Sequence, residues 1–325
     1  ACHPQPPPLA DTVTVIVGHH PFEVTTLRRD VETHGRHATV AFTDDWAEDA
    51  RRRDFTMNAL YCDARGKIHD YANGYADILS NRITFVGNPA ARIKEDYLRI
   101  LRYFRFLSVF ANMKADAASL AACVRLKKGL LTLSAERISQ EMFKLLVGPK
   151  AVPVLTLMAK HKVLKLVVPH TDEFRVIQRL PPDPLLRAFA LAKKPESLRE
   201  AWRLSNNQAR RIEALLQGTV LTPKLRENEQ QKLLYAMGAE AWRGSVHLAW
   251  ARSRAPLTDR AWHRMLKLPG RWVVPSFPIA GRDLLALGFP SGPDLGRELK
   301  RLEDYWIASD FTSTREELLE SIRGN

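Results

Sequence analysis

A chain of 325 residues is long enough for two or three domains and too long for one small module. Hydrophobic residues make up 45% of it and charged residues 26%, an ordinary globular composition that excludes a globally disordered protein. The 49 Lys and Arg residues outnumber the 36 Asp and Glu residues, and the formal net charge of +13 predicts a polyanionic partner, with nucleic acid the leading candidate.

Membrane spans and disulfide or zinc frameworks are also excluded. The longest apolar runs, such as 13–17 and 164–168, are much shorter than the roughly 18 residues of a membrane helix, so we expect no membrane partner. Cys2, Cys62 and Cys123 are odd in number and far apart, which predicts neither a disulfide framework nor a zinc site. A reducing, cytoplasmic location fits this cysteine usage.

The first 88 residues have the pattern of a mixed α/β segment. β-Branched residues alternate over 12–17, the pattern breaks at 18–21, and it resumes over 22–27, which predicts a β-hairpin. Two short apolar segments around a turn at 64–66 predict a second strand pair, and 82–86 predicts a further strand.

Beyond residue 88 the pattern changes to amphipathic helices, and we expect no strands there. The predicted layout is therefore α+β, with a mixed segment followed by a mostly helical remainder. The predicted helices cover 89–110, 134–147, 150–166, 183–192, 196–204, 208–217, 229–239, 298–306 and 314–322.

The first candidate site is the stretch 51–59, Arg-Arg-Arg-Asp-Phe-Thr-Met-Asn-Ala. Consecutive arginines fan around a helix, so some of them can point into a cleft, where guanidinium groups match phosphate oxygens. Asp54 would anchor an arginine or accept a hydrogen bond from a sugar hydroxyl. The alternative is a solvated helix whose arginines pair with the acids between 44 and 49.

The second candidate site is the stretch 95–106. Asp96 and Arg99 are three residues apart, so they are neighbours on a helix, and Arg102 and Arg105 continue the same ridge. An Asp beside an Arg presents acceptors and donors that could match a base edge. The alternative is an intrahelical salt bridge, worth only a few tenths of a kcal/mol, roughly.

Four motifs follow one another along the chain. They are Arg-Arg-Asp-Phe-Thr-x-Asn-Ala at 52–59, Asp-x-x-x-Gly-x-x-Asp-Ile at 70–78, Glu-Asp-x-x-Arg-x-x-Arg-x-x-Arg-Phe at 95–106 and Leu-Ser-x-Glu-Arg-Ile-x-x-Glu at 133–141. In this order they closely resemble the class II tRNA nucleotidyltransferases, the CCA-adding enzymes, to which bacterial poly(A) polymerases are close relatives. The likeness extends to 13–28 and 280–318 and so spans nearly the whole chain.

The resemblance implies roles for the matched residues around a nucleotide. Arg53 would contact the incoming nucleotide, with Asp54 and Asn58 around its ribose and triphosphate. Asp96 and Arg99 would read the Watson–Crick edges of cytosine or adenine in place of a nucleic-acid template.

Other matched residues are implied to support that site. Arg102 and Arg105 would hold phosphates or orient the reading pair. A flexible connector between head and neck would contain Asp70, Gly74 and Asp77, and a helix bracing the reading element would contain Glu136, Arg137 and Glu141.

The implied fold is a partial, polymerase-β-like nucleotidyltransferase head over 1–88, a helical neck over 89–148, a helical body over 149–255 and a helical, tRNA-binding tail over 256–325. The implied reaction is template-independent addition of CCA to the 3′ end of tRNA from CTP and ATP, releasing pyrophosphate, with the tRNA acceptor arm as partner. A poly(A) polymerase and an A-only or CC-only nucleotidyltransferase are the alternatives within the enzyme class.

One part of the family pattern is absent from residues 1–325. The family's glycine-rich G-G-x-V-R-D element and its D-x-D pair, which binds two Mg²⁺ ions, do not occur. Because the resemblance implies Mg²⁺ as cofactor, we expect the opening segment to be missing here, with an inactive fragment as one consequence. Glu23 is a candidate third carboxylate or, alternatively, an exposed strand acid. A non-catalytic RNA-binding remnant is the second alternative function.

Overall fold

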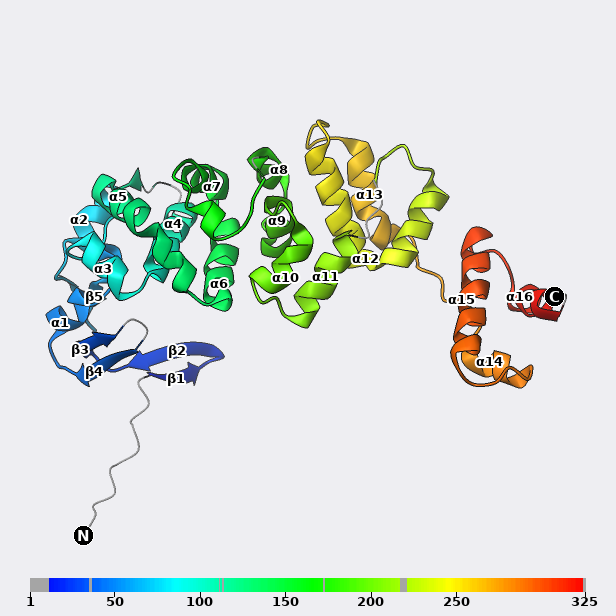
Figure 1. Cartoon of the computed structure of the whole chain (residues 1–325), viewed down its shortest axis with the longest axis horizontal. Helices are drawn as coiled ribbons and strands as arrows, with labels where there is room; N and C mark the ends of the chain where they lie inside the picture. The colour runs from blue at the N-terminus through cyan, green and yellow to red at the C-terminus, as the bar shows by residue number, and fades with distance from the viewer. Residues whose placement is uncertain are drawn as a thin grey trace, which may run out of the picture. The chain divides into compact units, whose positions relative to one another are not determined.

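Two antiparallel strand pairs come first among the residues that the computed structural model describes, which are 12–34, 37–110, 112, 114–171, 173–216 and 221–323. Strand β1 (Thr12–Val17) pairs antiparallel with β2 (His20–Thr25), as the alternation predicts. The turn residues Gly18 and His19 both have positive φ, the geometry that suits a two-residue hairpin turn. A second antiparallel pair joins β3 (Arg28–His34) and β4 (His37–Phe42) (Figure 1).

The rest of the first 88 residues combines short helices with one small strand pair and one strand of a second pair. The predicted pair around 64–66 is confirmed as β5 (Leu60–Cys62) and β6 (Ile68–Asp70), which are antiparallel. Strand β7 (Arg82–Ile83) pairs in parallel with β8 (Lys114–Ala115), so the expectation that no strand follows residue 88 is wrong. A two-residue strand is too short to show alternation. The elements are α1 (Trp46–Arg51), η1 (Thr56–Asn58), β5 (Leu60–Cys62), β6 (Ile68–Asp70), α2 (Gly74–Leu79) and β7.

The described residues form two compact units. Unit 1 lies within Ala1–Gln178 and Pro182–Ser205, and unit 2 lies within Arg179–Pro181 and Asn206–Asn325. The helices after residue 88 in and at the edge of unit 1 are α3 (Pro89–Glu95), α4 (Leu98–Val109), α5 (Ala117–Leu126), η2 (Lys127–Thr132), α6 (Ala135–Leu146), α7 (Ala151–Lys160), η3 (Leu164–Leu166), α8 (Phe174–Arg179), α9 (Pro184–Leu191), η4 (Pro195–Ser197) and α10 (Leu198–Ala201).

Helix α4 lies at the centre of unit 1. It packs against α6 and α7 through a buried face that includes Ile100, Phe104 and Leu107, spaced four and three residues apart. Tyr103 is also buried; its ring stacks on Phe85 with centroids 5.6 Å apart, and its hydroxyl donates to a backbone carbonyl. The stacking on Phe85 holds the middle of α4 against the first 88 residues.

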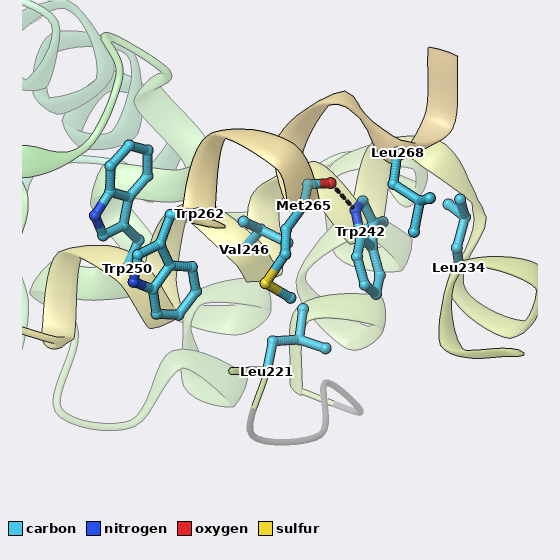
Figure 2. Close-up of a cluster of buried hydrophobic side chains, with 8 residues drawn as sticks. All are labelled: Leu221, Leu234, Trp242, Val246, Trp250, Trp262, Met265 and Leu268. Atoms are coloured by element: carbon cyan, nitrogen blue, oxygen red, sulfur yellow. Dashed lines mark hydrogen bonds between the residues drawn. The ribbon is translucent and has the colours of Figure 1, made fainter. Parts of the chain in front are cut away.

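The regular elements among the described residues of unit 2 are all helices, and the unit contains two hydrophobic clusters. Its long helix α12 (Glu227–Arg252) is interrupted at Gly238, which has a φ of 76°. Figure 2 shows the first cluster, in which Trp242 donates a 2.8 Å hydrogen bond from its indole nitrogen to the carbonyl of Met265 on α13. The second cluster includes Leu284, Leu302 and Trp306. The helices are α11 (Asn206–Leu216), α12 (Glu227–Arg252), α13 (Arg260–Arg271), α14 (Gly281–Ala286), α15 (Pro293–Ala308) and α16 (Arg315–Arg323).

The α+β class predicted from the sequence is confirmed. The division between the two units falls within 149–255, the range that the resemblance assigns to the body. Across the described ranges, no helix combines the length and apolarity needed to cross a membrane.

Candidate nucleotide-binding site

An open cavity of about 600 Å³ lies where α1, the segment after it, α4 and α6 meet. Its size is in the range of small-molecule sites. Five arginines and two aspartates line it, drawn from three stretches far apart in the sequence. The lining residues are Arg52, Arg53, Asp54, Asn58, Asp96, Leu98, Arg99, Arg102, Phe106 and Arg137.

Asp54 connects α4 to the segment that follows α1. Its carboxylate, 8% exposed, accepts hydrogen bonds from Arg102 Nε at 2.6 Å and from Asn58 Nδ2 at 2.9 Å. One buried acid therefore orients two other cavity residues, one of them 48 positions away along the chain.

Asp49 anchors the two arginines at the end of α1. It is fully buried and accepts from Arg52 Nε at 2.6 Å, Arg53 Nη2 at 2.7 Å and the Tyr61 hydroxyl at 2.5 Å. The sequence pattern indicated Asp49 only as one of several acids that could pair with arginines, although it lies three and four residues before Arg52 and Arg53. The pattern gave no signal for Tyr61.

The Asp49 contacts shift its ionisation. Burial by itself raises the pKa of this carboxyl, but hydrogen bonds from Tyr61, Arg53, the Arg28 backbone N–H and Arg52 outweigh burial and lower the pKa from 3.8 to about 2. Because the folded-state pKa is depressed, the stabilisation is present above the unfolded-state value and disappears as the pH falls through the folded-state value.

We therefore expect the wild-type protein and the Asp49→Asn variant to differ less in free energy of unfolding as the pH falls from about 5 to about 2. The difference should shrink by about 1–2 kcal/mol, because protonated Asp49 loses the charge that its arginine partners favour. Urea unfolding of both proteins across this pH range measures the difference, and titrations common to both proteins cancel. A difference that stays constant with pH would contradict the assignment.

Asp96 lies between two helices rather than on one. Helix α3 ends at Glu95 and α4 begins at Leu98, and Asp96 has extended backbone angles (φ −154°, ψ 108°). The prediction that Asp96 and Arg99 are neighbours on one continuous helix is therefore wrong. The Asp96 side chain accepts from Leu98 N at 3.0 Å, a local bond that competes with helix continuation, and from Arg137 Nη2 at 2.7 Å.

Arg99 also lines the cavity but is not paired with Asp96. Its Nη1 donates to Glu95 Oε2 at 2.5 Å and to the Arg92 carbonyl at 2.8 Å, and its Nη2 donates to the Arg52 carbonyl at 3.3 Å. The alternative of a simple Asp96–Arg99 salt bridge therefore does not hold, because each side chain is held by other partners.

Tyr97 is fixed beside Asp96 by a glycine. A Cβ at Gly129 would lie 2.0 Å from the Tyr97 ring, so only glycine permits this contact. Nothing in the sequence pattern pointed to Gly129.

Arg105, Glu136 and Glu141, the other site residues predicted on α4 and α6, are not among the residues that line the cavity. Arg105 Nε lies 3.2 Å from Glu141 Oε2 in a mostly buried ion pair between α4 and α6. Burial lowers the pKa of Arg105, with Glu141 acting in the opposite direction. Glu136 lies in the first turn of α6.

The predicted connector residues lie around the start of α2. Asp70 accepts from the backbone N–H groups of Ala72, Gly74 and Tyr75, each at 3.0 Å. Buried Asp77 accepts from Thr56 Oγ1 at 2.7 Å. The flexibility that the resemblance implies for this segment stays a prediction.

Glu23 lies apart from the cavity residues. It is exposed on β2, opposite Thr14 of β1. Within the part of the chain that the structure describes, no group of three or more His, Cys, Asp or Glu side chains could hold a metal ion. The acidic, His and Cys side chains of the described residues therefore do not fit the magnesium site that the resemblance implies.

Comparisons with known proteins match three successive parts of the chain to family models. The family model of the poly A polymerase head domain matches residues 8–84, the probable RNA- and SrmB-binding site of polymerase A matches 112–175, and the putative tRNA nucleotidyltransferase domain 2 matches 185–322. In solved structures, the Bacillus stearothermophilus CCA-adding enzyme in complex with CTP is similar with a TM-score of 0.78 and 26% identity, over 97% of this chain and 82% of that one.

Curated proteins similar to this chain are also CCA-adding enzymes and CCA tRNA nucleotidyltransferases. The CCA-adding enzyme of Streptococcus mutans is 28% identical over 96% of this chain and 81% of its own length. The mitochondrial CCA tRNA nucleotidyltransferase 1 of Danio rerio is 34% identical over 96% of this chain and 75% of its own length. With this degree of identity over three quarters of that relative, the chain belongs to the CCA tRNA nucleotidyltransferase family.

Proposed function

We propose that the chain serves template-independent addition of CCA to the 3′ end of tRNA, and that the cavity binds the incoming CTP or ATP. The observation that carries this proposal is the convergence of five arginines and two aspartates on one nucleotide-sized cavity. The related Bacillus stearothermophilus enzyme was solved with CTP. The excess of positive charge over the whole chain supports a tRNA partner, with the acceptor arm as the part nearest the reaction.

The charge of the cavity suits a triphosphate. Arg52, Arg53 and Arg102 can donate to phosphate oxygens, while Asp54 lies where it can accept from a ribose hydroxyl. The arginines are already held by carboxylates before any nucleotide binds, so little ordering is needed on binding.

The Asp96 and Arg99 side chains have the donors and acceptors needed to read a base. Cytosine and adenine each present an amino donor beside a ring-nitrogen acceptor on the Watson–Crick edge, which matches a carboxylate next to a guanidinium. Arg137 holds Asp96, and Glu95 holds Arg99. The chain would thus select the base with protein groups in place of a template.

The proposal is tested with the double variant Asp96→Ala with Arg99→Ala. We expect wild-type protein to bind CTP and ATP more tightly than UTP or GTP in calorimetric titrations. The double variant should lose most of this preference, about tenfold, because its base-reading hydrogen bonds are gone. Its affinity for tRNA should change little. The matched control is Asp63→Ala with Arg65→Ala, in the turn between β5 and β6, where Asp63 is half-buried, Arg65 is exposed and neither lines the cavity.

Three results would separate the alternatives. Unchanged nucleotide preference in the double variant would reject the base-reading role. Incorporation assays on tRNAs lacking A, CA or CCA distinguish CCA addition from A-only, CC-only and poly(A) activity. Binding of tRNA without binding of any triphosphate would favour the RNA-binding remnant. The titrations are run with and without Mg²⁺, whose requirement stays an expectation from the resemblance.

A further inference from the structure

We infer that Asp49 is a positioning residue of the nucleotide site, whose buried carboxylate sets the orientation of Arg52 and Arg53 toward the triphosphate. This inference rests on the proposed function of the cavity. Asp49 itself does not line the cavity, so it acts through the two arginines that do.

Asp49 contacts the same edge of both guanidinium groups. Its Oδ1 lies against Nε and Nη2 of Arg52, and its Oδ2 lies against Nε and Nη2 of Arg53. These contacts use the Nε–Nη2 edge of each guanidinium, so Asp49 leaves the Nη1 group of both arginines uncontacted. Because a guanidinium is planar and rigid, fixing one of its edges also fixes the direction in which the remaining N–H groups point.

The charge balance also suits this role. One carboxylate between two guanidinium groups leaves the set with a net positive charge, and the third side-chain donor, the Tyr61 hydroxyl, is neutral. An anionic ligand is therefore still attracted, while the repulsion between the adjacent arginines is offset. The arginines occupy the end of α1, where a helix favours positive charge.

A purely structural role is the competing explanation. Asp49 also accepts from Arg28 N at the start of β3 and from Tyr61 on β5, so it links α1 to two strands. The experiment must therefore separate loss of stability from loss of arginine geometry.

The test compares Asp49→Asn with wild type in calorimetric titrations of the full chain with CTP and with CMP. We expect the Kd for CTP to rise about tenfold and the Kd for CMP to rise less than about threefold, because the arginines act on the added phosphates. Asp45→Asn, an exposed N-cap acid on the same helix, is the matched control and should leave both values unchanged. Tyr61→Phe removes a link to a strand but keeps both arginine contacts, so it should lower the unfolding midpoint while the Kd for CTP changes less than about threefold.

Several outcomes would overturn the inference. These are a folded Asp49→Asn variant that binds CTP like wild type, equal losses for CTP and CMP, or an equal loss of CTP affinity in Tyr61→Phe. Should Asp49→Asn not fold, NMR of the wild type decides: the Nε–H groups of Arg52 and Arg53 should exchange slowly before nucleotide is added, and fast exchange would refute the inference. A wild-type chain that binds neither CTP nor ATP would instead refute the proposed function, and this inference with it.

Discussion

Asp54→Ala is expected to weaken CTP and ATP binding by between about tenfold and about a hundredfold. The substitution releases Arg102 and Asn58 together, since both donate to this one carboxylate, and it removes the acceptor proposed for the ribose hydroxyl. Loss of a negative charge also favours the anionic ligand, but this gain is only about 1 kcal/mol in a water-filled cavity. Isothermal titration with each nucleotide measures the net effect.

Two further variants divide the Asp54 effect into its parts. Asp54→Asn keeps an acceptor of the same shape without the charge, so its loss should be intermediate. Asn58→Ala removes one partner and leaves the Arg102 ion pair intact, so it should have the smallest effect. If Asp54→Ala bound CTP as tightly as wild type, Asp54 would have no part in nucleotide binding.

Trp242→Ala is expected to destabilise unit 2 by about 3–5 kcal/mol, the cost of deleting a large buried aromatic side chain. Trp242 lies on α12 and is fully buried, and its removal leaves the Met265 carbonyl of α13 without its indole donor. Hydrogen exchange followed by mass spectrometry should show lower protection in α12 and α13, with protection in α4 unchanged.

Trp272→Ala is the control for this prediction. Trp272 lies at the edge of the same cluster and is only partly buried, so its loss should cost clearly less than the loss of Trp242. Equal effects of the two substitutions, or loss of protection in α4, would show that Trp242 does not hold a core confined to unit 2.

Much of the local structure was predictable because it depends on near neighbours. The hairpin of β1 and β2 follows from alternating β-branched residues around Gly18, and α6 follows from its amphipathic spacing. The family was indicated by motif order, and most of the charged residues that line the cavity lie in the two stretches indicated by arginine and aspartate spacing; Arg137, predicted only as a bracing residue, lines it too. The excess of basic residues likewise indicates a polyanionic partner without any knowledge of the fold.

Contacts between distant residues needed the tertiary structure. The pairing of Asp54 with Arg102 spans 48 positions and that of Asp96 with Arg137 spans 41. At the helix break, Asp96 contacts Arg137 of a distant helix and also accepts a local hydrogen bond from Leu98 N. The sequence did not predict this break, because the helical periodicity continues through residue 96. Periodic patterns report which face of an element is buried, but not which group on another element meets it. For this reason the chain's spacing indicated the site's chemical groups, whereas packing alone determined their partners and their orientation.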